Sequence, residues 1–480
     1  MECQDMEWKE GKVPSNGDTP SKIEIESPDA VKNGNIIADS TVPAGLQALF
    51  CACTNLYPDQ PNPLQVTALV KYWLGGPDPL DYISMYDVPG NDKLKIPPHW
   101  HYISFGLSDI HGDGRVHEFT GPDKVSGFGF ELTMRLKKEP TDKGPPTWPA
   151  AIMQGLAKYV FQSESTLCVG DHVSWNSPLD GGESRLQHML MAEDPCLGMV
   201  RTPNGNVQFV QVVGITSEEL RAVQHWNGAG VLAILKRSLV TGGPWLVTDM
   251  RRGESVYELD PAVAEEVEAG IESTGSNLSG VSARISWVMQ PDVTLNSCLR
   301  AQDRSLASVD SPSITVKKEN NSDSGQDLPL IKSEPKQEES EQNVDTEEKQ
   351  RTACSGAVPA ELFETQRLES VHVTINLESG ALLPLALRGR LKHGRHFTFK
   401  AVLGSAALTL IAPGVSGAFV SAESPYAVRG PWLQLLIPDD LIELMSADLA
   451  GLADPDEVKV PVTFQWPAHK LTLTIVGEDC

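Results

Sequence analysis

The chain has 480 residues and a formal net charge of −25, with 40% hydrophobic and 6% aromatic residues. This length predicts two or three domains, and the composition is sufficient for substantial hydrophobic cores. An acidic surface repels nucleic-acid phosphates, so the charge argues against direct binding of DNA or RNA and favours basic partners, although ordinary solubility also explains it.

The cysteines and the apolar runs indicate the compartment. Eight cysteines are scattered along the chain without a Cys-x-x-Cys motif, which is typical of a reducing compartment. The first residues are polar and acidic, so we expect no secretory signal there. No run of 18 apolar residues occurs, and we expect no membrane-spanning helix. The sequence therefore predicts a soluble intracellular protein.

The first part of the chain divides into a tail and a large folded domain. Residues 1–42 carry many charges and few large apolar groups, which predicts a disordered tail. Residues 43–290 begin with a helix-like stretch that runs to Leu56. Helix patterns follow at 149–161, which starts at a proline, and at 216–235, which opens with a capping pattern. We predict strands at 66–73, 101–107, 128–136, 185–191, 207–213 and 245–249.

Residues 291–357 are predicted to be a disordered acidic linker. No aromatic residue occurs between Trp287 and Phe363, and the segment is too long and too polar for a packed loop. Two lysines lie in the hydrophobic-Lys-x-acidic pattern of SUMO acceptor sites, and three serines lie among acidic residues that suit acid-directed kinases. These possible modification sites are Lys317, Lys332, Ser322, Ser324 and Ser340.

Residues 358–480 form a second, smaller domain that is rich in strand patterns. One helix is predicted at 439–445, after a proline. Gly-Pro-Trp-Leu occurs both at 243–246 and at 430–433, where a Gly-Pro turn leading into a buried Trp strand would explain both copies. The predicted strands are 371–377, 382–390, 396–402, 407–411, 432–437 and 471–476. The whole chain is thus expected to be α+β or mixed α/β, with two lobes joined by the linker.

The best candidate for chemistry is a group of histidines. His99 and His101 would share one face of a strand, with His111, His117 and Glu118 close in sequence. This spacing is compatible with metal ligands, but it lacks a third spaced ligand, so ordinary structural histidines are the favoured interpretation.

A second candidate is the triad-like run Asp171-His172-Val-Ser174. Neighbouring residues of a strand point to alternate faces, so these side chains cannot relay a proton among themselves. We therefore expect no enzyme, no cofactor and no metal.

Long stretches of the chain resemble the Suppressor of fused family. The resemblance covers nearly all of 44–290 and 358–476. It is carried by Leu56-Tyr-Pro-Asp-Gln-Pro-Asn-Pro-Leu-Gln-Val-Thr-Ala, Val70-Lys-Tyr-Trp-Leu-Gly-Gly-Pro-Asp-Pro-Leu-Asp-Tyr, His99-Trp-His-Tyr-Ile-Ser-Phe-Gly-Leu-Ser-Asp, Gly170-Asp-His-Val-Ser-Trp, Gly242-Gly-Pro-Trp-Leu-Val-Thr-Asp-Met-Arg-Arg-Gly-Glu and Arg388-Gly-Arg-Leu-Lys-His-Gly-Arg-His-Phe-Thr-Phe-Lys. The differing tail and linker suggest an invertebrate orthologue.

The resemblance implies a negative regulator of Hedgehog signalling. Proteins similar to this one bind Gli / Cubitus interruptus zinc-finger transcription factors in the cytoplasm and the nucleus, act as corepressors there, and are linked to the Fused kinase. In the family, a segment of the Ser-Tyr-Gly-His-Leu type lies extended between the two lobes and pairs with strand edges. A monomer without nucleic-acid or membrane binding is expected.

The resemblance also implies the residues that contact this peptide. Asp171 and Glu193 would accept hydrogen bonds from the histidine of the ligand or from donors close to it. Tyr159 would pack and form a hydrogen bond, and Val281 lies near the end of the larger lobe. Leu382 would give apolar contact and strand pairing from the smaller lobe. From the residues alone, Tyr159 is equally compatible with a core position and Asp171 with a plain turn.

Two other classes of protein remain open on the sequence. One is a scaffold for pathway kinases. The other is a metal-dependent enzyme with an active site between the lobes, for which the histidine group would supply the ligands.

Overall fold

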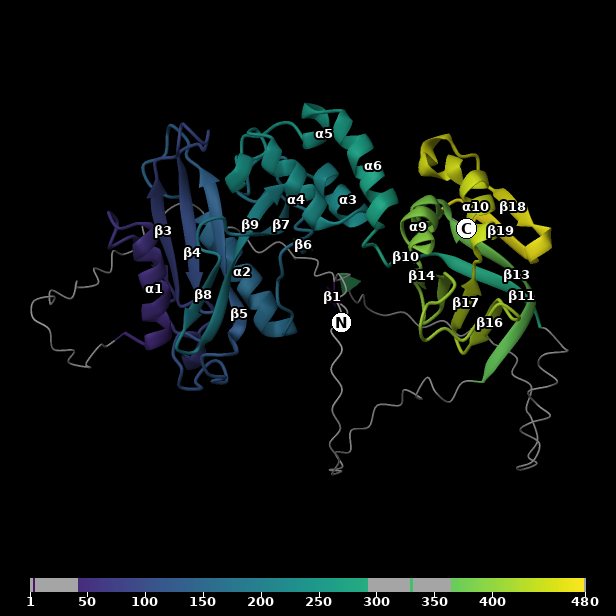
Figure 1. Cartoon of the computed structure of the whole chain (residues 1–480), viewed down its shortest axis with the longest axis horizontal. Coiled ribbons are helices and arrows are strands. Elements are labelled where there is room, and N and C mark those ends of the chain that lie inside the picture. The colour runs from purple at the N-terminus through teal and green to yellow at the C-terminus, as the bar shows by residue number, and fades with distance from the viewer. Residues whose placement is uncertain (1–2, 5–41, 292–328, 331–363, 479–480) are drawn as a thin grey trace, which may run out of the picture. The chain divides into compact units, whose positions relative to one another are not determined.

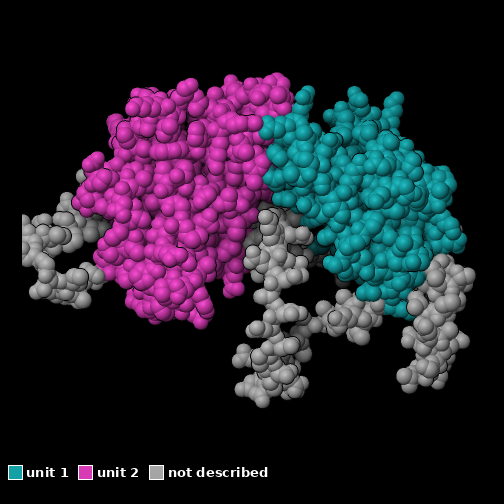
Figure 2. Space-filling view, in the orientation of Figure 1, with its two compact units in different colours: residues 1–5, 224–227, 265–480 teal, residues 6–223, 228–264 magenta. Residues whose placement is uncertain are grey.

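The computed structural model describes residues 3–4, 42–291, 329–330 and 364–478, whose helices and strands are drawn in Figure 1. The chain divides into two compact units, which Figure 2 colours separately. Unit 2 comprises residues 6–223 and 228–264, and unit 1 comprises residues 1–5, 224–227 and 265–480. Each unit combines a large sheet with helices, which confirms the predicted mixed fold with two sheet-containing lobes.

Unit 2 is built on an eight-stranded sheet. The order is β2-β3-β4-β5-β9-β7-β6, and β8 pairs with β9. Only β5 and β9 run parallel, whereas the other pairs are antiparallel. The strands are β2 (Leu64–Thr67), β3 (Tyr82–Val88), β4 (His99–Phe105), β5 (Val125–Lys137), β6 (His172–Val173), β7 (His188–Glu193), β8 (Met199–Thr202) and β9 (Gly205–Ile215).

Helices cover both faces of this sheet. Helix α2 (Trp148–Ser163) packs its apolar side on one face, in a core cluster that includes Trp100 and Tyr102. Helix α1 (Ala44–Leu56) packs on the other face with Ile103 and Phe105. Because side chains alternate along a strand and both faces are covered, every residue of β4 is buried.

The remaining helices of unit 2 lie in its last hundred residues. Helix α3 opens with a reciprocal cap, in which Glu219 N–H bonds to Thr216 and Thr216 N–H bonds to the Glu219 carboxylate. These elements are α3 (Ser217–His225, whose last residues belong to unit 1), α4 (Gly228–Arg237), η2 (Gly243–Trp245) and α5 (Val256–Leu259). A short helical turn, η1 (Tyr72–Leu74), follows β2.

Unit 1 contains a nine-stranded sheet in the order β10-β14-β15-β17-β16-β13-β19-β18, with β11 also paired to β13. The pairs β10–β14, β13–β19 and β15–β17 are parallel. The strands are β10 (Gly280–Ala283), β11 (Ile285–Pro291), β13 (Thr365–Asn376), β14 (His396–Ala401), β15 (Ala407–Ile411), β16 (Tyr426–Arg429), β17 (Trp432–Leu436), β18 (Val462–Trp466) and β19 (Leu471–Val476).

The core of unit 1 is formed by one large apolar cluster between this sheet and its helices. Phe397, Phe399 and Leu433 from the sheet contact Leu387 and Leu441 from the helices. The helices are α6 (Ala262–Thr274), α8 (Leu377–Gly380), α9 (Leu383–Gly389) and α10 (Asp439–Asp448), with turns η4 (Leu391–His393), η5 (Ala450–Ala453), η6 (Pro455–Glu457) and η7 (Pro467–His469). Two short strands, β1 (Cys3–Gln4) and β12 (Pro329–Leu330), also pair.

The division between the units differs from the predicted boundary at 290. Strand β10 pairs with β14, and β11 pairs with β13, so residues 280–291 belong to the sheet of unit 1. The partner strands β14 and β13 lie about a hundred residues away in the sequence, so no local residue pattern predicts this pairing. The predicted tail at 1–42 and linker at 291–357 fall almost wholly outside the described residues.

Several predicted elements are wrong. The predicted strand at 382–390 is helix α9, because Pro384 fits the first turn of a helix and the buried residues Leu383, Leu387 and Leu391 recur every four residues. The run 66–73 leaves its strand at Thr67 and turns into η1. The run 245–249 forms η2 and one isolated bridge, and Trp432 is exposed in β17. The predicted helix at 216–235 is two helices, α3 and α4.

Candidate functional site

The sheet of unit 2 ends at β6, which is paired to β7 alone within the described chain. Asp171 accepts a main-chain hydrogen bond from Met191 N–H at 2.8 Å, just before β6 begins. Main-chain groups of successive residues point to opposite sides of a strand, so those of His172 face away from β7. Among the described residues, no strand pairs with this outer side of β6.

The side chains of Asp171, Glu193 and Tyr159 all belong to unit 2. The Asp171 carboxylate accepts from Cys168 N–H at 2.8 Å and thereby holds the turn that leads into β6. Glu193 is the last residue of β7 and is exposed. Tyr159 lies on α2 and packs against the same core cluster as Val173 of β6. The Asp171 carboxylate therefore stabilises a turn. The contacts of Asp171, Glu193 and Tyr159 with a peptide stay predictions.

The sheet of unit 1 ends at β10, which carries Val281. Thr398 N–H donates to the Ser279 carbonyl and Val402 N–H donates to the Ala283 carbonyl, so the main-chain groups of the odd-numbered residues 279–283 face β14. The main-chain groups of Gly280 and Ser282 therefore face the outer side. The hydroxyl of Ser379 donates to the Ser282 carbonyl at 3.1 Å and covers part of that side.

Position 280 requires glycine. A Cβ atom there would lie 2.3 Å from the carbonyl oxygen of Thr398, a separation that side chains do not tolerate. The missing side chain lets β10 lie close against β14. The sequence prediction named Val281 but missed Gly280 and Ser282, and their only local signal is the small-residue run Ser279-Gly-Val-Ser-Ala283.

Leu382 does not lie in a strand, so the strand pairing expected of it is wrong. It is the residue before α9, its N–H bonds to the Ser379 carbonyl at 3.2 Å, and its half-buried side chain packs against the core of unit 1. An apolar contact from Leu382 to a ligand stays a prediction. The possible modification sites Lys317, Lys332, Ser322, Ser324 and Ser340 lie outside the described residues.

The histidines of β4 are parts of a buried polar network. His101 Nε2 lies 3.1 Å from the Asp194 carboxylate and its Nδ1 lies 2.7 Å from the Tyr57 hydroxyl. His99 Nδ1 lies 2.8 Å from the Pro97 carbonyl and its Nε2 lies 3.1 Å from Arg135. Both nitrogens of each ring are thus hydrogen-bonded, which supports the structural interpretation.

Burial keeps both rings neutral. It lowers the pKa of His99 to about 3 and the pKa of His101 to about 4. His101 then carries its proton on Nε2, facing Asp194, and accepts the Tyr57 hydroxyl on Nδ1. His111 contacts Asp81, and His117 contacts the Gly106 carbonyl. The described residues contain no group of three or more metal-ligating side chains.

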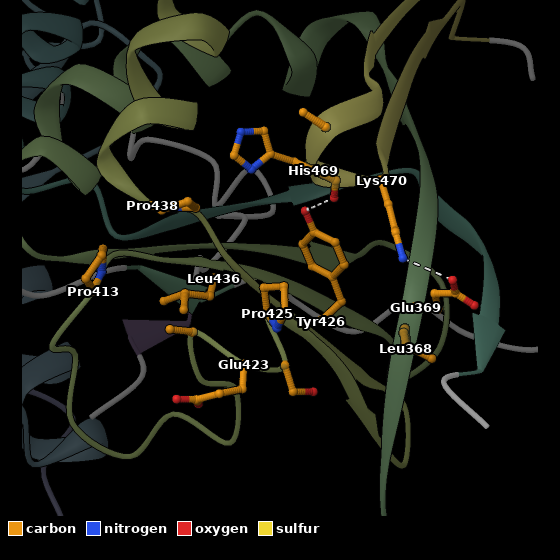
Figure 3. A pocket seen from close by; sticks show the side chains of 13 residues that line it. Leu368, Glu369, Pro413, Glu423, Pro425, Tyr426, Leu436, Pro438, His469 and Lys470 are labelled. Atoms are coloured by element: carbon orange, nitrogen blue, oxygen red, sulfur yellow. Dashed lines mark hydrogen bonds and ion pairs between the residues drawn. The ribbon is translucent and has the colours of Figure 1, made fainter. Parts of the chain in front are cut away.

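A pocket of about 400 Å³ opens in unit 1, away from β10. Figure 3 shows the Tyr426 ring at its centre, with Pro425, Pro438 and Leu436 along its walls. The Tyr426 hydroxyl donates to the His469 carbonyl at 2.8 Å, and Lys470 forms an ion pair with Glu369 at 3.0 Å. None of the predicted peptide-contact residues lines this pocket.

Two units that each combine helices with a mixed sheet define the class of this protein as a two-lobed α+β fold. Two family models match: "Suppressor of fused protein (SUFU)" over residues 76–253 and "Suppressor of Fused Gli/Ci N terminal binding domain" over residues 265–475. The chain belongs to the Suppressor of fused family.

Relatives match over most of their length. Suppressor of fused homologues from Mus musculus and Homo sapiens are 53% and 52% identical over 444 residues, which is 90% of this chain and 92% of each relative. The crystal structure of Drosophila Suppressor of Fused has a TM-score of 0.69 at 39% identity, and the match covers 91% of this chain and 97% of that one. Among the described residues, no helix is long and apolar enough to cross a membrane.

Proposed function

We propose that this protein is a negative regulator of Hedgehog signalling that binds Gli / Cubitus interruptus transcription factors in the cytoplasm and the nucleus. The observation that carries the proposal is the outer side of β10, because it lies within the residues that match a Gli/Ci-binding domain and no strand of the described chain pairs with it, although the Ser282 carbonyl already accepts from Ser379. The family membership supports the pathway.

The binding mode that we propose is strand addition. An extended segment of the Ser-Tyr-Gly-His-Leu type pairs with the open edge of β6 in unit 2 and with the open edge of β10 in unit 1. Main-chain hydrogen bonds then supply affinity, and side-chain contacts supply specificity. Since each edge strand is short, a segment that uses only one of them gains few hydrogen bonds, and both units are needed for tight binding.

Charged side chains next to β6 suit a ligand that carries a histidine. Glu193 is exposed at the end of β7, and Asp171 precedes β6. A carboxylate accepts a charge-assisted hydrogen bond from an imidazolium or another cationic donor. The net charge of −25 additionally attracts a basic transcription factor before contact.

The other classes receive less support. A metal-dependent enzyme would need His99 and His101 as ligands, yet both rings are buried and hydrogen-bonded on both nitrogens. A scaffold that binds a Fused-type kinase is compatible with the same protein, because kinase binding and peptide binding do not require the same surface.

The test measures binding of a fluorescent Ser-Tyr-Gly-His-Leu-containing peptide to the full chain. Strand addition uses every second amide of the guest, so N-methylation along the peptide should reduce affinity at alternate positions only. Glu193→Gln and Asp171→Asn should each weaken binding by about thirtyfold or more, which corresponds to the ~2 kcal/mol of a hot-spot contact. Asn retains an oxygen that can accept from Cys168 N–H, so the turn is preserved.

Glu139→Gln is a matched control, because Glu139 is another carboxylate of unit 2 but pairs with Arg251. It should bind the peptide as the unaltered chain does. Equal sensitivity at every N-methylated position, or full affinity of both Glu193→Gln and Asp171→Asn, would contradict the proposal.

A further inference from the structure

The opposite end of the sheet in unit 2 carries a second open edge with apolar side chains around it. Strand β2 is the last strand of this sheet and pairs with β3 alone within the described chain. Its sequence, Leu-Gln-Val-Thr, contains no charge, proline or bulge, which are the devices that normally protect an edge strand.

The residues after β2 are apolar and exposed. Soluble proteins rarely gather so many large apolar groups on one short segment unless a partner covers them. The segment 69–74, which we call the apolar turn, contains Leu69 (90% exposed), Leu74 (61%), Val70 (49%), Trp73 (40%) and Tyr72 (37%), and Leu64 of β2 is 55% exposed.

The hydrogen-bonding pattern shows which groups of β2 are available. Ala68 N–H donates to the Asp81 carbonyl at 3.2 Å, so the main-chain groups of the even-numbered residues 64–68 face β3. The main-chain groups of Gln65 and Thr67 therefore face outward. Beyond Leu64, the Gln60 side chain bonds both main-chain groups of Asp87 in the place of a strand. The edge of β3 is thus closed by Gln60, whereas no strand of the described chain pairs with the outer edge of β2.

The apolar turn is held in one shape. Leu74 N–H and Gly76 N–H both bond to the Lys71 carbonyl. The Tyr72 ring lies 4.8 Å from that of Phe161 on α2, and the Arg115 guanidinium lies 4.7 Å from the Trp73 ring. A Cβ at Gly76 would lie 1.9 Å from the Val70 carbonyl oxygen, so only glycine fits there. A rigid apolar surface loses little entropy when it binds.

The charged groups next to this surface are already paired. Lys71 lies 3.6 Å from Asp81, Lys158 lies 2.9 Å from Asp78, and Arg115 bonds Asp113. The surface formed by β2 and the apolar turn therefore carries no unpaired charge from Lys71, Lys158 or Arg115 that would select a charged guest. The rest of the chain is strongly acidic, which repels a second copy and any acidic guest.

We propose that the edge of β2 and the apolar turn form a docking site, separate from β6 and β10, for an extended segment of a partner protein that alternates apolar with uncharged or basic side chains. The outward groups of Gln65 and Thr67 require a guest that offers its own main chain, which a lipid surface does not. The guest lengthens the sheet beyond β2 and covers Leu69 and Leu74.

The experiment places a photo-crosslinking amino acid at position 69 of the full chain in cells that express it. A second version with the crosslinker at Leu403, which is 88% exposed in unit 1, is the matched control. Segments crosslinked only from position 69 are identified by mass spectrometry and made as fluorescent peptides. We expect such a segment to be apolar, free of acidic residues and able to bind the purified chain.

Binding of that peptide to variants then decides the proposal. Leu69→Ser with Leu74→Ser should reduce affinity at least tenfold, and Thr67→Pro should do the same, because proline removes an outward N–H without affecting the pairing to β3. Leu403→Ser should change nothing. Because the Leu69→Ser, Leu74→Ser variant changes only exposed side chains, it tests the site even if Thr67→Pro does not fold.

Crosslinks from position 69 only to lipid, to a second copy or to residues 1–41 of the same chain would overturn the proposal. No crosslink above the control, or an affinity that the Leu69→Ser, Leu74→Ser variant leaves unaltered, would do so equally. Binding of a Gli-type peptide at β6 and β10 should not respond to these substitutions, so the two proposals fail independently.

Discussion

Arg135 and Asp194 are fully buried side chains that neutralise each other inside unit 2. Arg135 donates to Asp194, Gln211 and His99. Asp194 also accepts from Cys196 N–H, Leu197 N–H and Thr133. Because Asp194 directly follows β7, this network fixes the chain next to Glu193, at the end of the strand where the peptide site is proposed.

The first prediction concerns this buried pair. Asp194→Asn keeps the shape of the side chain but leaves the Arg135 charge without a counter-ion, which typically costs about 3–5 kcal/mol of unfolding free energy. Glu193→Gln, one residue earlier and exposed, should change it by less than about 0.5 kcal/mol. Urea unfolding of the full chain, with hydrogen exchange in the peptides of unit 2 as the readout, measures the change in unfolding free energy of both variants. A loss below about 1 kcal/mol for Asp194→Asn would show that the network does not hold the fold.

Helix α4 begins against the turn that carries Asp171. A Cβ at Gly228 would lie 2.1 Å from the carbonyl oxygen of Gly170, and Gly170 itself has a φ of +94°. Two glycines therefore let a helix start in contact with the main chain next to β6. The position of Asp171 depends on this approach, although Gly228 lies far from it in the sequence.

Gly228→Ala should therefore affect both stability and binding. The added methyl group must push the 168–171 turn away from α4, which typically costs about 1–3 kcal/mol, and it displaces the edge of β6. We expect weaker binding of the Gli-type peptide at a temperature where the variant is still folded. The matched control is Gly253→Ala, because nothing lies within 4 Å of a Cβ there. If Gly228→Ala binds the Gli-type peptide as tightly as the unaltered chain does, the position of α4 does not affect the peptide site at β6.

The elements that could be predicted from the sequence are those with a clear local period. Helices α1, α2 and α10 and the strands β4, β5, β9, β14, β15 and β19 follow their apolar patterns. The sequence predicts a strand at 382–390 where the structure has helix α9, because a short leucine-rich run fits both periods. Strands β10 and β11 were missed, since their partners β14 and β13 lie far along the chain.

The candidate site could be predicted only in part. The family resemblance alone implies four of the candidate contacts, because no residue pattern identifies them as peptide-binding. These residues are Tyr159, Asp171, Glu193 and Val281. An open edge is defined by the lack of a neighbouring strand, which is a property of the folded sheet and not of the strand itself. For this reason neither Gly280 nor the edge of β2 could be identified from residue patterns.

At the scale of the whole molecule, five histidines of unit 2 have lowered pKa values. Burial lowers the pKa of His99 to about 3 and that of His101 and His172 to about 4, and it also lowers the pKa of His117 and His188. The unfolded chain binds protons at these sites near pH 6.5, whereas the folded unit does not. Stability therefore falls as the pH decreases from 6.5 towards 4.

One group opposes this trend. Burial raises the pKa of the Glu131 carboxyl, so within the same window folding promotes its protonation and acid favours the folded state. Because several histidines act against a single carboxyl, the histidines determine the sign for unit 2. Acid sensitivity of this origin is therefore expected in unit 2.

We therefore expect unit 2 to lose at least about 2 kcal/mol of unfolding free energy between pH 6.5 and pH 4.5, and to open before unit 1 does. Hydrogen-exchange mass spectrometry at several pH values, with intrinsic exchange rates corrected, resolves the two units by their peptides. Strands β4 and β9 report on unit 2, and β13 and β19 report on unit 1. If protection of β13 and β19 disappears first, the buried histidines do not control the acid response, and the carboxylates of unit 1 would have to be its cause.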